Sequence, residues 1–241
     1  MRPWVVAHRG ARGLVRFENT MEAFEKAVEV GADMMECDVH RTRDGRLVIF
    51  HDDVLPDGRP VASLSLGELG AWTRSRGFEA PTLDEVVDAL AGRIRFDVEV
   101  KAPGFEAEIV ALLTGRLRYD QFVVKSFHDT FVREVKLLDP RVVAGLLLGD
   151  DAPKHPVRHW LGELFPKARA SACRADFVSP HAQLLKLGYV KRAHAHGWGV
   201  YVWTVNDPHL MERLCRMGVD AIITDRPDLA LEVRQRHGRA G

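Results

Sequence analysis

The chain of 241 residues is long enough for one large α/β domain, and its 46% hydrophobic content with a mean hydropathy of -0.15 is typical of a folded protein. Its 34 basic and 34 acidic residues give zero formal net charge. This balance argues against nucleic-acid binding through a broad positive field, but a local cluster can still hold a small phosphorylated ligand. No apolar run approaches the ~20 residues of a membrane span, and the three cysteines are widely spaced. We therefore expect a soluble, cytoplasmic protein without stable membrane insertion, of open oligomeric state.

Short apolar strands alternate with helices along the whole chain, which is the pattern of a parallel sheet with helical crossovers. Apart from the returning arm of a hairpin at 47–50, the sequence predicts eight strands: Trp4–His8, Met34–His40, Ile94–Lys101, Phe122–Phe127, Val142–Leu148, Phe177–Ser179, Val200–Val205 and Ala221–Thr224. Helices are expected at 19–31 with Asn19 as the N-cap, and at 66–72, 82–90, 105–117, 130–138, 158–165, 182–196, 208–218 and from 227 onward.

Eight such units in 241 residues fit a closed TIM (β/α)8 barrel better than an open doubly wound sheet. The absence of a Gly-rich phosphate loop also weakens the open-sheet alternative. We predict a single α/β barrel domain over residues 1–241, with a small insertion at about 53–81 after the strand-two hairpin.

Residues 36–52 hold more chemistry than any other stretch. Asp44-Gly45 lies between two strand-like runs and is a strong signal for a two-residue hairpin turn. Counting outward from such a turn places Asp38 opposite His51, and Glu36 then shares a face with both. The competing interpretation is a solvent-facing hairpin that carries these polar residues outward.

Barrels of this type carry their active sites at the C-terminal ends of the strands. Polar residues gather at this end of successive predicted strands: His8 and Arg9, Glu36 and Asp38, Glu99 and Lys101, Trp203 and Asn206, and Asp225 and Arg226. We therefore expect a catalytic site at this end of the barrel.

The residue types at this end indicate a class of reaction. Three carboxylates supply hard oxygen ligands suited to Mg²⁺ or Ca²⁺, namely Glu36, Asp38 and Glu99. Zinc is the competing metal, but no His-x-His or His-Glu-x-x-His pattern is present, so we interpret His8 and His51 as proton carriers. Arg9 and Lys101 offer positive charge to a substrate anion. Together these groups favour phosphoryl chemistry on a phosphodiester.

Ten short motifs, running in order from residue 8 to residue 227, match one known family. They are His8-Arg9-Gly10, Glu18-Asn19-Thr20, Glu36-Cys37-Asp38, Asp44-Gly45, His51-Asp52, Pro81-Thr82-Leu83, Glu99-Val100-Lys101, Ser126-Phe127, Trp203-Thr204-Val205-Asn206 and Ile223-Thr224-Asp225-Arg226-Pro227. On these residues the sequence resembles the glycerophosphodiester phosphodiesterase family, within the phosphatidylinositol-phospholipase-C-like barrel superfamily.

The resemblance implies hydrolysis of glycerophosphodiesters, such as glycerophosphocholine or glycerophosphoethanolamine, to glycerol 3-phosphate and an alcohol. It implies one divalent cation, Mg²⁺ or Ca²⁺, and an insertion over the barrel mouth. The implied residue roles are metal ligation by Glu36, Asp38 and Glu99; general acid and base catalysis by His8 and His51 in an open order; phosphate binding by Arg9 and Lys101; a place near the metal or the glycerol for Glu18; and a place along the glycerol pocket for Trp203. Either water or the glycerol hydroxyl could attack the phosphorus.

The sequence departs from the family's pattern at Phe17, where proline is usual, and at Lys125, where a small residue is common. Lys125 either adds charge inside the barrel or reaches solvent near the strand end. We expect His40 to be solvated, whereas His181 could face the pocket.

Two other functions stay open. One is a lysophospholipase D-type activity, for which apolar residues of the insertion such as Leu64, Leu66, Leu69 and Trp72 would form a groove; the alternative is that they pack onto the protein. The other is a barrel that binds phosphodiesters without catalysis.

Overall fold

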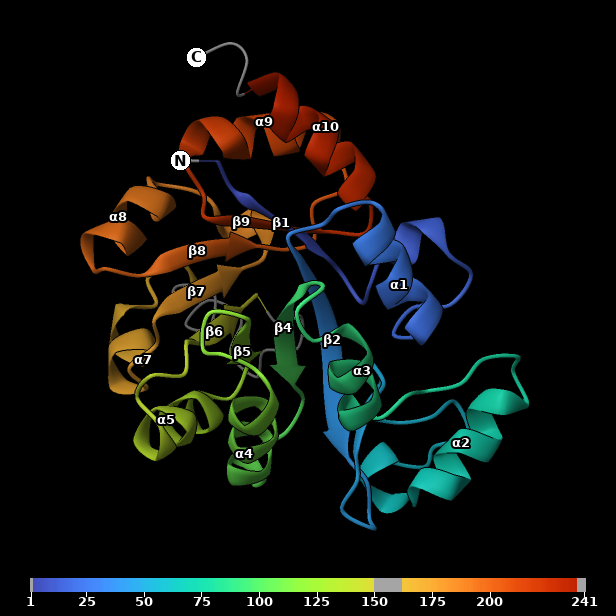
Figure 1. Ribbon diagram of the computed structural model, residues 1–241. Coiled ribbons are helices and arrows are strands. Elements are labelled where there is room, and N and C mark those ends of the chain that lie inside the picture. Colours follow the sequence, from blue (N-terminus) through green and yellow to red (C-terminus); the bar gives the residue numbers. More distant parts are fainter. Residues whose placement is uncertain (1, 150–161, 238–241) are drawn as a thin grey trace.

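The computed structural model describes residues 2–149 and 162–237, which fold into a barrel of eight parallel strands surrounded by helices (Figure 1). The ring runs β1–β2–β4–β5–β6–β7–β8–β9 and closes because β1 pairs with both β2 and β9. The strands are β1 (Trp4–Ala7), β2 (Met34–Arg41), β4 (Arg95–Val100), β5 (Phe122–Ser126), β6 (Ala144–Leu148), β7 (Phe177–Pro180), β8 (Gly199–Val202) and β9 (Ala221–Thr224). The predicted TIM barrel is confirmed.

Most of the helices lie on the outside of the barrel. They are α1 (Met21–Glu29), α2 (Leu66–Arg74), α3 (Leu83–Leu90), α4 (Glu106–Arg116), α5 (Asp129–Leu138), α7 (Lys167–Ala172), α8 (Tyr189–Ala195), α9 (Pro208–Met217) and α10 (Pro227–His237). The helix expected near 158–165 falls largely outside the described residues. None of the described helices is long and apolar enough to span a bilayer.

The helix predicted at 182–196 is two separate pieces. A 3-10 turn, η3 (Ala182–Leu184), precedes α8, and between them Leu187 and Gly188 adopt left-handed backbone conformations with φ of 52° and 70°. Leu184 and Tyr189 are buried in the same core on either side of the break. The apolar spacing therefore resembles one helix although the backbone does not continue.

The hairpin after β2 has a longer loop than predicted. Val39 pairs with Ile49 and Arg41 with Leu47, so Asp38 stands opposite Phe50 rather than opposite His51. The loop has three residues, 43–45, instead of two. The Gly45 amide donates to the Thr42 carbonyl at 3.0 Å, and Gly45 itself adopts a left-handed conformation with φ of 75°. A turn followed by a left-handed glycine is the second common hairpin geometry, and the sequence alone does not distinguish it from the two-residue turn.

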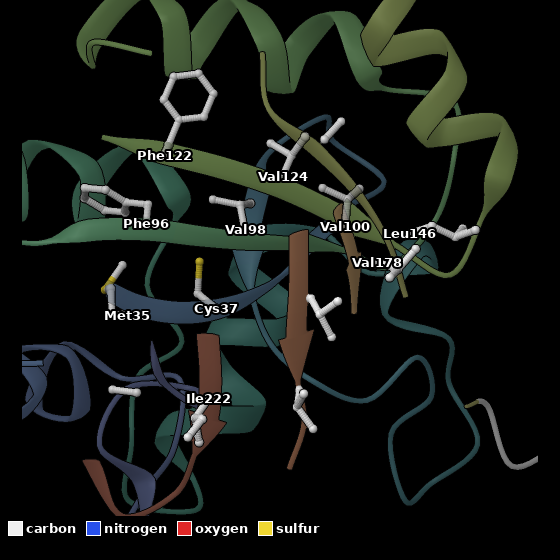
Figure 2. Packing of buried hydrophobic residues seen from close by; sticks show 14 of the residues in the cluster. Met35, Cys37, Phe96, Val98, Val100, Phe122, Val124, Leu146, Val178 and Ile222 are labelled. Atoms are coloured by element: carbon white, nitrogen blue, oxygen red, sulfur yellow. The ribbon is translucent and has the colours of Figure 1, made fainter. Parts of the chain in front are cut away.

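Two apolar layers stabilise the barrel. Outward-facing strand residues pack beneath the helices, and they include Met35, Cys37, Phe96, Val98, Phe122 and Val124 (Figure 2). A smaller cluster fills the interior towards the N-terminal ends of the strands: Val6, Met34, Val123, Phe177, Tyr201, Ala221 and Ile223. Because side chains alternate along a strand, Met34 is followed on the inner face by Glu36 and Asp38. The interior thus changes from apolar to charged towards the C-terminal ends.

Residues 53–81 pack around a cluster of their own. Seven buried side chains from the hairpin and this segment form it: Val48, Phe50, Leu55, Val61, Leu64, Leu69 and Ala80. Ser65 and Glu68 form a capping box that starts α2, which confirms the helix expected near 66–72. Figure 1 shows α2 beside the hairpin and away from the ring of strands.

Candidate active site

Three carboxylates converge inside the barrel near the C-terminal ends of β2 and β4. The parallel register pairs Asp38 with Glu99 and Glu36 with Asp97, so alternation turns all four side chains inward. Oxygens of Glu36, Asp38 and Glu99 lie within 4.8 Å of one another, and all three residues are buried. Burial, together with the charges of Asp38 and Glu36, raises the pKa of Glu99 against the opposing effect of Lys101.

This donor set fits a divalent cation. The converging atoms are hard carboxylate oxygens, which Mg²⁺ and Ca²⁺ prefer, and among the described residues no cysteine or histidine belongs to the group. Clustered buried carboxylates repel one another, and burial together with this repulsion raises the pKa of Glu99. A cation held between the three oxygens would relieve it.

Lys101 bridges two of the three carboxylates from the end of β4. Its Nζ lies 2.7 Å from Asp38 Oδ1 and 2.6 Å from Glu99 Oε1. Burial disfavours the charged ammonium, but the two carboxylates outweigh burial and raise the pKa of Lys101. The same contacts hold the pKa of Asp38 well below its usual range, although burial alone would raise it. With 12% of its side chain exposed, Lys101 reaches the mouth of the barrel.

Arg9 follows β1 in a strained backbone conformation with φ of 52°. This conformation lets its backbone amide donate to Glu36 Oε2 at 2.8 Å, while its side-chain Nε lies 3.3 Å from Asp38 Oδ2. Glu18 accepts from Arg9 at 2.7 Å and also lies 3.0 Å from Arg12. Glu18 therefore contacts the arginines rather than the three carboxylates.

Lys125 lies inside the barrel, with only 1% of the residue exposed. Its Nζ donates to Asp97 Oδ2 at 2.7 Å and lies 3.6 Å from Glu36 Oε1. Burial opposes the ammonium charge, yet the charges of Asp97 and Glu36 prevail and raise the pKa of Lys125. Burial raises the pKa of Asp97 to about 6 even beside this lysine. Of the two predicted placements of Lys125, the one inside the barrel is correct.

His8 is held from behind by a short hydrogen-bonded chain. Its Nδ1 lies 2.7 Å from Asp225 Oδ1, and the Asn206 side-chain amide donates to the other oxygen of Asp225 at 2.7 Å. The Asn206 carbonyl oxygen accepts from the backbone amide of Asp225 at 2.9 Å. This chain of hydrogen bonds fixes the orientation of the His8 ring through Nδ1, and Nε2 is the ring nitrogen that takes no part in it.

His51 lies beyond the last hydrogen-bonded pair of the hairpin, and its Nδ1 lies 2.7 Å from Asp52 Oδ1. It is among the residues whose charge acts on Asp38, although it does not face Asp38 across the strands. His51 borders a pocket of about 190 Å³ whose walls include Phe17, Trp72 and Phe78. The site thus opens towards the insertion, and the aromatic walls include Phe17, one of the two departures from the family pattern.

Two residues in the site differ from their sequence predictions. Thr20, not Asn19, caps α1; Asn19 takes φ of 53° and donates from its side-chain amide to Asp38 Oδ2 at 2.7 Å. His40 is 5% exposed instead of solvated, and burial lowers its pKa despite the hydrogen bond to the His51 carbonyl. The capping pattern gave no indication that Asn19 contacts Asp38. By contrast, His40 lies on the inner face of β2, two residues after Asp38, and this position could have indicated that it is buried.

Trp203 follows β8 on another side of the mouth. Its Nε1 donates to the Ser179 carbonyl at 2.7 Å, which fixes the indole. The rings of Phe127 and His181 pack edge-on against it, with centroids at 5.7 Å and 5.2 Å. His181, which the sequence allowed to face the pocket, therefore lies beside Trp203.

Comparison with known proteins identifies the family. The model of the glycerophosphoryl diester phosphodiesterase family matches residues 8–229. The chain belongs to this family. The predicted membership, and with it the prediction of a phosphodiesterase enzyme rather than a non-catalytic barrel, is confirmed.

Individual members of the glycerophosphodiester phosphodiesterase family match over nearly their full lengths. The glycerophosphodiester phosphodiesterase of Caldanaerobacter subterraneus subsp. tengcongensis is 29% identical over 255 residues, covering 99% of this chain and 100% of that protein. The crystal structure of a glycerophosphodiester phosphodiesterase from Parabacteroides distasonis has a TM-score of 0.80 at 27% identity, covering 100% and 99% of the two chains. An Oleispira antarctica phosphodiesterase, solved with its product sn-glycerol-3-phosphate, has a TM-score of 0.81 at 25% identity and 97% coverage of both chains.

Proposed function

We propose that this enzyme hydrolyses glycerophosphodiesters, such as glycerophosphocholine or glycerophosphoethanolamine, to glycerol 3-phosphate and an alcohol. The observation that carries the proposal is the cluster of Glu36, Asp38 and Glu99, whose oxygens lie within 4.8 Å of one another at the C-terminal end of the barrel. Arg9 and Lys101 contact the cluster, and the charge of His51 acts on Asp38. The product bound to the Oleispira relative supports glycerol 3-phosphate as the phosphorylated product.

One divalent cation, Mg²⁺ or Ca²⁺, would be held by these three carboxylates. When bound, it supplies positive charge that polarises the phosphodiester and stabilises negative charge on its oxygens. Asn19 and Arg9 orient the ligands: the Asn19 amide donates to Asp38, and the Arg9 backbone amide donates to Glu36. Such outer contacts keep metal ligands in place.

Arg9 and Lys101 would bind the phosphate. Both side chains are only slightly exposed, at 14% and 12%, and both contact Asp38. The Nε of Arg9 is buried against Asp38, so the guanidinium would act on the phosphate through its positive charge and its outer nitrogens. Glu18 positions the Arg9 guanidinium by accepting a hydrogen bond from its Nη1.

His8 and His51 would divide the two proton transfers of the reaction, one removing a proton from the attacking hydroxyl or water and the other protonating the leaving oxygen. The Nδ1 of each ring lies beside a carboxylate, that of Asp225 for His8 and that of Asp52 for His51. This partner fixes the tautomer and directs Nε2 of each ring to the substrate.

The two ends of the substrate would lie on different sides of the mouth. The glycerol would lie along Trp203, and the alcohol would lie near His51 under the insertion. We treat residues 1–241 as one domain in which the segment 53–81 forms this insertion, as its separate apolar cluster suggests.

Two of the four residues expected to form a lysophospholipase groove are buried within the insertion. Leu64 and Leu69 are 3% and 0% exposed and point into the cluster of the insertion, and Leu66 and Trp72 pack against that cluster. Leu64 and Leu69 therefore do not line a groove for an acyl chain, whereas Trp72 lines the pocket beside His51.

Replacement of each histidine tests the proposed catalysis. The variants His8→Ala and His51→Ala should each lower kcat for glycerophosphocholine by ~10² to 10⁴. The matched control is His209→Ala, because His209 is exposed on α9 and lies outside the site. A folded His8→Ala or His51→Ala variant with the turnover of the control would contradict the assignment.

A further inference from the structure

A buried lysine lies next to a carboxylate that we assign to the metal site. The ammonium of Lys125 is 3.6 Å from Glu36 Oε1, and it cannot move to the substrate because its side chain is 2% exposed and bonded to Asp97. Lys101 differs, since it reaches the mouth of the barrel with 12% exposure. Of the two lysines, Lys125 is the fixed one.

The charges around the three carboxylates nearly cancel. Seven acidic and basic side chains no more than 14% exposed form two groups of ion pairs there. Arg9 contacts Asp38 and Lys101 contacts Asp38 and Glu99, whereas Lys125 contacts Glu36 and Asp97. Four negative and three positive charges leave one net negative charge. A divalent cation changes the sum to one positive charge, and a phosphodiester monoanion then brings it to zero. Without Lys125 the cation alone would neutralise the cluster.

We propose that Lys125 is a positioning residue that weakens the binding of the divalent cation to Glu36, Asp38 and Glu99 and so keeps one positive charge for the phosphate of the substrate. The inference rests on the metal site of the proposed function. Its physical basis is the short distance between a permanent cation and a carboxylate ligand in a buried site, where charges interact more strongly than in water. Asp97 holds the ammonium in place from the other side.

The test compares two variants that differ only in the charge at position 125. Asp97→Asn serves as the background, because it removes a neighbouring carboxylate that could otherwise take up a proton when the lysine is lost. The comparison is between Asp97→Asn and Asp97→Asn/Lys125→Met. The matched control is Asp97→Asn/Lys167→Met, which removes the same charge from an exposed position on α7. The affinity for Mn²⁺ alone is measured by electron paramagnetic resonance, after circular dichroism has shown that each variant is folded.

The proposal predicts that Asp97→Asn/Lys125→Met binds Mn²⁺ at least tenfold more tightly than Asp97→Asn, whereas the Lys167 control binds like its background. A purely structural lysine would give the opposite sign, because its loss would disorder Glu36. An unchanged or weaker Mn²⁺ affinity in the Lys125 variant would overturn the proposal. Tight Mn²⁺ binding by a wild-type enzyme that releases no glycerol 3-phosphate would instead overturn the proposed function, and the Lys125 comparison would still stand.

Discussion

Asp225 shows how much of the site depends on a residue that never needs to touch the substrate. Burial alone would raise its pKa, but the hydrogen bonds from His8 and Asn206 and the charge of Arg12 hold the pKa below the usual value. Such a carboxylate is ionised at neutral pH and orients the imidazole in front of it. At the scale of single residues, the side chains of the site are held in place by hydrogen-bonded neighbours, as His8 is by Asp225.

The lowered pKa gives a stability prediction with a definite sign. The carboxylate of Asp225 stabilises the fold at a pH above its ordinary pKa of 3.8, and this contribution is lost as the pH falls through the lower folded pKa. We expect Asp225→Asn to lower the free energy of unfolding by about 1 kcal/mol at pH 7 and by much less near pH 3. Urea denaturation at both values measures the difference. Glu79→Gln, at an exposed position, is the control, and an equal loss at both pH values would contradict the prediction.

The sequence predicts the residue identities of the candidate site better than their contacts. Polar residues at strand ends were sufficient to single out His8, Glu36 and Glu99. By contrast, Asn19 fits a local capping pattern in the sequence, but its side-chain amide donates to Asp38, because the bend at residues 9–19 brings it to β2. Contacts between residues far apart in the chain, such as those of Lys125 with Asp97 and Glu36, depend on the register between parallel strands, which no short hairpin turn fixes.

At the scale of elements, turn chemistry accounts for the differences between sequence and structure. Asp44-Gly45 correctly indicates a hairpin, but the loop length depends on contacts outside the dipeptide. Asp44 accepts hydrogen bonds from the Thr42 hydroxyl at 2.7 Å and the Leu66 amide at 3.0 Å, which attach the tip to the insertion. The left-handed Gly45 completes the longer loop.

Two glycine substitutions of opposite sign test this account of the hairpin. Gly45→Ala should destabilise the protein by about 1 kcal/mol, because an alanine is strained at φ 75°. Gly115→Ala should stabilise it by about 0.5–1 kcal/mol, since Gly115 lies within α4 and an added methyl group meets no atom within 4 Å. Urea denaturation of both variants measures the difference. A Gly45→Ala protein as stable as wild type would exclude the left-handed loop.

At the scale of the whole molecule, the alternation of strands and helices predicts both the barrel and the edge at which the site lies. Eight strands of parallel type close the ring through the pairing of β1 with β9 and β2. The closure brings His8, which follows the first strand, to Asp225, which follows the last strand and lies 217 positions away in the chain. The regular topology explains why strand order was predictable, while irregular connections such as 182–196 were not.

The activity proposed for this enzyme is metal-dependent hydrolysis of glycerophosphodiesters at a three-carboxylate site. The most direct test is release of glycerol 3-phosphate from glycerophosphocholine, assayed with Mg²⁺, with Ca²⁺ and with a chelator. We predict release that a chelator abolishes and that added Mg²⁺ or Ca²⁺ restores, and that falls at least ~10²-fold in Glu36→Gln at equal metal concentration. Release that persists in chelator, or no release under any condition from a folded protein, would contradict this function.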